Sequence, residues 1–109
     1  MERTEYHRII RLHLATAYLL SEEKIDSVLP GFLKSLQQLM FGLEQAAVTG
    51  NDETVTRTGH AIKGALLNLG LSDLAEKAFT IEKNAGSQKT GRERSRCIAE
   101  LNAEIAKII

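Results

Sequence analysis

The chain has 109 residues, 43% of them hydrophobic, and its 14 basic side chains equal its 14 acidic side chains in number. This length suits a single domain with a modest core, and the even charge balance argues against binding to nucleic acid or to an anionic membrane. No apolar run approaches the ~20 residues that cross a bilayer, and the one cysteine, Cys97, cannot form an internal disulfide. We therefore expect a cytoplasmic protein in which Cys97 is a buried free thiol.

The N-terminal part of the chain predicts two helical segments before its one proline. Residues 3–20 indicate a first helix, and its broad apolar face is made by Ile9, Ile10, Leu14, Ala17 and Tyr18. His7 and His13 are six residues apart and so lie apart around that helix, and we interpret them as solvated or packing histidines and not as metal ligands. Ser21 is typical of the N-cap of a short helix over residues 22–29, after which Pro30 either ends the pattern or begins a new helix.

Two helices then lead to the middle of the chain. The clearest amphipathic helix begins near Pro30, where apolar residues recur every three or four positions: Phe32, Leu33, Leu36, Leu39, Met40, Leu43 and Ala47. Residues 49–52 end this helix and cap the next one, which is predicted over residues 53–69 and is closed by Gly70.

The C-terminal part of the chain predicts two more helices. Ser72 and Asp73 open the first, whose pattern includes Leu74, Ala75, Ala78, Phe79, Glu82 and Ala85. The connection after Gly70 is so short that this helix and the preceding one must pack as an antiparallel hairpin. Residues 86–91 are loop-like, and the last helix carries its apolar face at Cys97, Ile98, Leu101, Ile105, Ile108 and Ile109.

These elements predict an all-α fold. Residues 29–109 are expected to form an antiparallel up-and-down four-helix bundle. Residues 1–28 are expected to add an N-terminal helical extension, and the sequence leaves open whether this extension completes the bundle, docks a partner or makes a dimer.

The candidate functional residues lie in the helix predicted over residues 53–69. On a helical wheel the apolar stripe of that helix is made by Val55, Gly59, Ile62, Leu66 and Leu69. His60 falls about 140° from the centre of this stripe, and Gly64 falls near 180°. A glycine inside a helix costs about 0.5–1 kcal/mol relative to alanine. Its position one turn from an outward histidine removes side-chain bulk where another molecule could approach the imidazole.

Two neighbours extend this arrangement. Lys63 follows His60 by three residues and can place a positive charge near anything attached to the ring. Leu67 adds an apolar patch at the rim that suits a docking partner. This combination predicts that the imidazole of His60 accepts an anionic group and passes it on. The ring has a cation nearby, open space in front of it and an apolar rim.

The predicted hairpin adds Glu82 as a further candidate. If the turn centres near Leu71, Glu82 follows the turn by as many residues as His60 precedes it, so the two should lie at one level of the bundle. A hydrogen bond from one imidazole nitrogen to Glu82 would fix the tautomer and leave the other nitrogen as the nucleophile. Two alternatives stay open: a salt bridge between Glu82 and Lys63, or a solvated carboxylate at the edge of the core.

The stretch His60-Ala61-Ile62-Lys63-Gly64-Ala65 resembles the His-x-x-Lys-Gly-(Ser/Ala) signature of histidine phosphotransfer (Hpt) domains of multistep two-component phosphorelays. The helical pattern is similar to that family from about residue 29 to residue 109. The departures are Leu66 and Leu67, where smaller residues are frequent in the family, and the extra N-terminal helix. Leu67 is expected to influence the choice of partner.

The resemblance implies that His60 accepts a phosphoryl group from a receiver-domain aspartate and gives it to another receiver. It implies charge stabilisation by Lys63, clearance for the receiver at Gly64, docking at Leu67 and orientation of the imidazole by Glu82. The implied partners are response-regulator receiver domains and a hybrid sensor histidine kinase. Any Mg²⁺ should be bound by the receiver.

The absence of a nucleotide-binding motif predicts a phosphoryl carrier and not an enzyme, with no cofactor and no metal of its own. We expect a monomer, with a dimer kept open. The alternative function is a helical interaction or dimerisation module in which His60 is never phosphorylated. A hydrolytic enzyme is a more distant alternative, because no serine or cysteine nucleophile pairs with a histidine.

Overall fold

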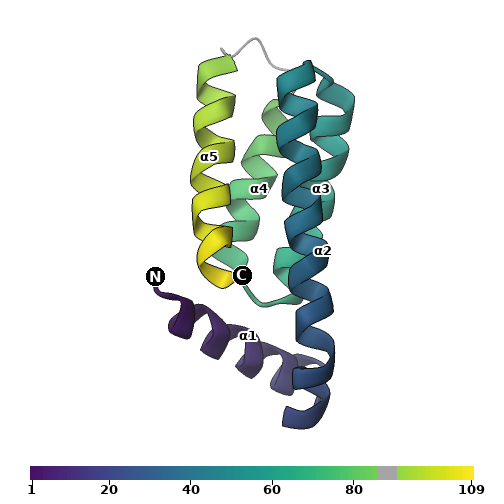
Figure 1. Ribbon diagram of the computed structural model, residues 1–109, viewed down its shortest axis with the longest axis vertical. Coiled ribbons are helices and arrows are strands. Elements are labelled where there is room, and N and C mark those ends of the chain that lie inside the picture. Colours follow the sequence, from purple (N-terminus) through teal and green to yellow (C-terminus); the bar gives the residue numbers. More distant parts are fainter. Residues whose placement is uncertain (86–90) are drawn as a thin grey trace.

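The structure is a computed structural model that describes residues 1–85 and 91–109, and these residues form five helices and no strand. The helices are α1 (Arg3–Ala17), α2 (Glu22–Thr49), α3 (Asp52–Asn68), α4 (Ser72–Asn84) and α5 (Gly91–Ile108). Helices α2 to α5 lie side by side as an up-and-down bundle, and α1 crosses the end of the bundle near the α3–α4 turn (Figure 1). The predicted all-α bundle is confirmed, whereas most of the loop expected over residues 86–91 lies outside the described residues.

The buried side chains form one apolar core to which every helix contributes. The stripe predicted in α3 is confirmed, because Val55, Gly59, Ile62, Leu66 and Leu69 are all buried. Two aromatic residues of the predicted apolar patterns lie at the surface and not in the core, since Phe32 is 44% exposed and Phe79 is 36% exposed. Cys97 is a free thiol, as expected, but it is only half-buried.

Pro30 neither ends nor begins a helix, and the separate short helix predicted over residues 22–29 is wrong. Helix α2 runs without a break from Glu22 to Thr49 and includes Pro30 in its interior. The missing N–H removes one hydrogen bond to the carbonyl of Asp26, and both Asp26 and Pro30 are exposed to water. Leu29 and Leu36 on either side are buried in the same core, so tertiary packing offsets the local cost of the proline. The expected domain boundary at residue 28 therefore falls inside α2 and stays a prediction.

The turns between helices are closed by the residues that the sequence indicated. Gly50 ends α2 in the left-handed conformation, with φ of 73°. The side chains of Ser21 and Asn51 accept hydrogen bonds from the backbone N–H groups of Lys24 and Thr54, each at 3.1 Å. These bonds satisfy donors that the first turn of a helix leaves unpaired.

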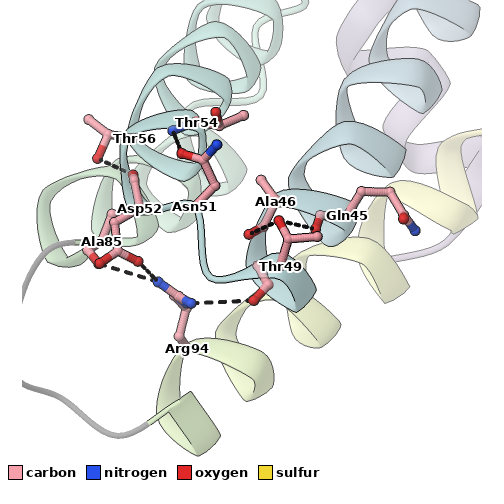
Figure 2. Close-up of polar contacts among 10 residues, drawn as sticks. Gln45, Ala46, Thr49, Asn51, Asp52, Thr54, Thr56, Ala85 and Arg94 are labelled. Carbon is pink, nitrogen blue, oxygen red and sulfur yellow. Dashed lines mark hydrogen bonds and ion pairs between the residues drawn. The ribbon is translucent and has the colours of Figure 1, made fainter.

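Arg94 joins three helices at the end of the bundle opposite α1, a role that the sequence analysis missed (Figure 2). Its Nη1 lies 2.6 Å from Oδ1 of Asp52 at the start of α3 and 3.3 Å from the carbonyl oxygen of Ala85 after α4. Its Nη2 donates at 3.5 Å to the carbonyl oxygen of Ala47 in the last turn of α2. Carbonyls at helix C-termini lack intrahelical partners, and a cation there also offsets the negative end of the helix dipole.

Helix α1 is held against the other end of the bundle by both histidines of its sequence. His7 Nε2 lies 2.7 Å from the carbonyl oxygen of Ile108 at the end of α5. The His13 ring packs on Gly70 in the α3–α4 turn, where a Cβ atom would come within 2.6 Å of His13 Cβ and Cγ. Gly70 is also left-handed, with φ of 78°. The interpretation of His7 and His13 as packing residues is therefore confirmed.

We expect Gly70→Ala to lower the free energy of unfolding by about 2 kcal/mol, because alanine is strained at this positive φ and its Cβ collides with His13. Urea denaturation followed by circular dichroism measures the change. Gly31→Ala is the matched control, since a Cβ at Gly31 meets nothing within 4 Å, and it should raise the stability by about 0.5–1 kcal/mol. Equal stability of the two variants would contradict the packing of α1 on this turn.

Candidate functional site

His60 projects from the outer face of α3, away from the core stripe. Its side chain is 67% exposed. Gly64 lies one turn further along the same face, and Leu67, one turn beyond that, is 48% exposed. The outward orientation predicted for these residues from the helical wheel is therefore confirmed.

Glu82 on α4 contacts both His60 and Lys63. Its Oε2 lies 3.2 Å from Nδ1 of His60, and its Oε1 lies 3.3 Å from Nζ of Lys63. The expectation that Glu82 lies level with His60 is confirmed, and the salt bridge considered as an alternative is present as well. An ionised carboxylate only accepts hydrogen bonds, so Nδ1 is the protonated nitrogen in this contact and Nε2 carries the free lone pair of the neutral ring.

Gly59 brings the two helices close enough for this contact. A Cβ atom at Gly59 would lie 3.3 Å from Cβ of Glu82 and 3.4 Å from its Cα and backbone nitrogen. Any larger residue would push α4 away from α3 at the level of the carboxylate. Gly59 belongs to the predicted buried stripe, but its role in bringing α4 close to α3 was not predicted. The available signal was a glycine directly before the outward histidine.

Phe79 lies beside the charged residues and not in the core. Nζ of Lys63 lies 4.6 Å from the centroid of the Phe79 ring, and Nζ of Lys83 lies 5.2 Å from it. Both distances fall within the range of cation–π attraction. The ring therefore contacts two ammonium groups, of which that of Lys63 also pairs with Glu82. This cluster was missed, although Phe79 and Lys83 are four residues apart on one helix and so share a face.

The face around the imidazole leaves room for a second molecule. A Cβ atom at Gly64 would meet nothing within 4 Å, and Leu67 presents an apolar side chain beyond it. Within the described ranges, no group of three or more His, Cys, Asp or Glu side chains is arranged to hold a metal ion. The geometry thus provides an accessible imidazole nitrogen, a neighbouring carboxylate and the ammonium group of Lys63 next to that carboxylate.

The model of one protein family, described as the Hpt domain, matches residues 27–109. The chain belongs to the Hpt domain family. Hpt domains are helical bundles that carry phosphoryl groups in phosphorelays, work with receiver domains and histidine kinases, and are not catalytic enzymes. No match was found among curated proteins or among solved structures.

The family match covers the whole of α3 and α4, so the contact between His60 and Glu82 lies inside the Hpt domain. Helix α1 lies outside the matched residues. In the described part of the chain, no helix is long and apolar enough to cross a membrane.

We expect Glu82→Ala to shift the neutral His60 ring from the Nδ1–H tautomer towards Nε2–H, because the carboxylate that accepts from Nδ1 is lost. The ¹⁵N chemical shifts of the ring at alkaline pH distinguish the two tautomers. Lys63→Met is the control, since it removes the other partner of Glu82 and leaves the Nδ1 contact in place. An Nε2–H ring in the native protein would contradict the contact.

Proposed function

We propose that His60 is the phosphoacceptor of this Hpt domain: Nε2 takes the phosphoryl group from the aspartyl phosphate of one receiver domain and passes it to the aspartate of another. The observation that carries this proposal is the 3.2 Å contact between Nδ1 of His60 and Glu82. It supports the proposal because it occupies one nitrogen of a ring that is otherwise 67% exposed and leaves the other nitrogen available to a partner.

The transfer is an in-line displacement at phosphorus. The lone pair of Nε2 forms the new P–N bond as the bond between phosphorus and the aspartate oxygen breaks, and the electron pair of that bond leaves with the receiver's carboxylate. The proton on Nδ1 stays in place, so the ring becomes positively charged. Glu82 would stabilise this charge through the Nδ1–H hydrogen bond and is thus an orienting residue as well as a counter-charge.

Lys63 would offset negative charge on the phosphoryl group during the transfer. Its ammonium is already next to the site, 3.3 Å from Oε1 of Glu82, and a lysine side chain is flexible enough to exchange partners. Preorganised cations of this kind stabilise charge that develops in a transition state. Any Mg²⁺ would be held by the receiver, whose phosphorylated aspartate is the donor.

Gly64 and Leu67 would form the surface on which the receiver docks. The open space above Gly64 supports a role in clearance, and the exposed side chain of Leu67 supports apolar docking. The proposal includes action as a monomer in the cytoplasm, together with a hybrid sensor histidine kinase upstream. The competing function, an interaction module that is never phosphorylated, shares Leu67 but makes no use of the His60–Glu82 contact.

We expect the native chain to take label from a radiolabelled phosphorylated receiver domain, and His60→Gln to take none, because glutamine lacks the nucleophilic nitrogen. The label should be labile in acid and stable in alkali, as a phosphohistidine is. His13→Gln is the matched control and should be labelled normally. Label on the His60→Gln variant would overturn the assignment of the acceptor. A native chain left unlabelled by every receiver of the source organism would favour the interaction module.

We expect Gly64→Gln to slow transfer from the receiver about tenfold or more, which corresponds to about 1.4 kcal/mol, because its side chain fills the space above the imidazole. The fold should be intact and slightly more stable, since glutamine is a better helix former than glycine. Gly31→Gln is the matched control, because it places the same side chain at another open helical glycine, on α2. Equal rates of transfer to the two variants would count against the proposal that Gly64 leaves space for the receiver.

A further inference from the structure

Leu19 combines two features that are unfavourable for a folded chain. It is the one non-glycine residue with positive φ in the described part of the chain, at 57°. A left-handed conformation costs an ordinary residue about 1–2 kcal/mol. Leu19 is also 84% exposed, so burial of its side chain does not offset the free-energy cost of this conformation.

The turn after α1 needs the left-handed backbone but does not need leucine. The chain reverses there and is closed by a hydrogen bond from the N–H of Leu20 to the carbonyl of Leu14 at 3.2 Å. Glycine is the usual residue at a left-handed position after a helix, because it lacks the Cβ that causes the strain. Leu20 rather than Leu19 packs against the core. The fold therefore explains the conformation of Leu19 and leaves its side chain unexplained.

The residue before Leu19 is fixed to the end of α3. The hydroxyl of Tyr18 donates to Oδ1 of Asn68 at 3.1 Å. The Tyr18 ring meets the His13 ring edge to face, with centroids 5.8 Å apart, and His13 packs on Gly70. Tyr18 is 50% exposed. The turn after α1 thus presents two exposed residues, Tyr18, whose side chain is fixed by these contacts, and Leu19 next to it.

This place lies within reach of a molecule bound at His60. Asn68 follows His60 by eight residues on α3, which is about 12 Å along the helix axis. A protein interface of ordinary size covers about 800 Å² on each partner, equivalent to a disc of roughly 16 Å radius. A receiver centred on His60 would therefore cover Leu67 and reach the residues that contact Asn68.

We propose that Tyr18 and Leu19, here called the Leu19 corner, extend the docking surface for the receiver domain beyond Leu67. This inference rests on the proposed function, because transfer to His60 is what brings a receiver to this face. The structure supports a receiver rather than a second copy of the chain as the occupant, since the corner continues the same α3 face that presents His60 and Leu67. Because the side chain of Tyr18 is already held by Asn68 and His13, it loses little conformational entropy on binding. The corner would stabilise the complex without touching the reacting atoms.

The test compares Leu19→Gly with Val48→Ala. Val48 is 83% exposed and lies in the last turns of α2, at the end of the bundle away from α1 (Figure 1). Leu19→Gly relieves strain, so its melting temperature should equal or exceed that of the native chain. Its dissociation constant for a receiver domain activated with beryllofluoride, measured by calorimetry, should rise about fivefold to tenfold. Val48→Ala should bind as the native chain does.

The outcomes separate the corner from the phosphotransfer itself. In Leu19→Gly, transfer at saturating receiver should keep its native rate, while transfer at low receiver should slow by the same factor as binding. If Leu19→Gly binds the receiver with the dissociation constant of the native chain, the proposed role of the Leu19 corner is wrong. If Leu19→Gly alters the fold, Leu19→Asn decides, since asparagine also accepts the left-handed conformation. A native chain that binds receivers but takes no label overturns the proposed function alone, and a native chain that binds no receiver overturns both.

Discussion

The close approach of α3 and α4 at Gly59 is the constraint on which the site depends. A Cβ atom added at this position would lie only 3.3 Å from Cβ of Glu82, so the absence of a side chain lets the two helices lie close together. This spacing puts the carboxylate of Glu82 between His60 and Lys63, one contact from each of its oxygens. A wider hairpin would still form a bundle with a buried core, but its carboxylate would no longer orient the imidazole. The transfer proposed for His60 would therefore depend on Gly59, a buried residue behind the site.

The charges at the site would suit a ring that gains positive charge, as the transfer proposed for His60 requires. A half-buried carboxylate shared by a histidine and a lysine is paired before the reaction and remains paired after it. When the ring gains positive charge, the hydrogen bond from Nδ1 becomes charge-assisted and stronger. In the proposed transfer Lys63 would turn towards the phosphoryl group, and its ammonium already lies over the ring of Phe79. Charged groups that are already in place need little rearrangement during the transfer, and so they stabilise its transition state at low cost in free energy.

Much of the fold and of the site follows from the sequence because both depend on helical periodicity. The outward position of His60 and its level relative to Glu82 required only the phase of α3 and the shortness of the turn at Gly70. The failures have a common physical origin, since they concern contacts between elements. Pro30 stays in a helix because residues before and after it share one core, and local propensity says nothing of that. Arg94 finds its partners on three other segments, which no pattern along the chain can reveal.

Three unfavourable choices in this chain lie along the surface proposed for the receiver. Gly64 weakens a helix in which no neighbour requires a glycine, Leu67 exposes an apolar side chain beside it, and Leu19 adopts a strained conformation without burial. Phe41 and Val48 are exposed as well, but they occupy regular helix, where single exposed apolar residues are ordinary. Natural sequences depart from the rules of stability mainly at functional sites. Because Tyr18 contacts Asn68, the residue after Leu67, the proposal that one receiver covers both His60 and the Leu19 corner accounts for these departures together.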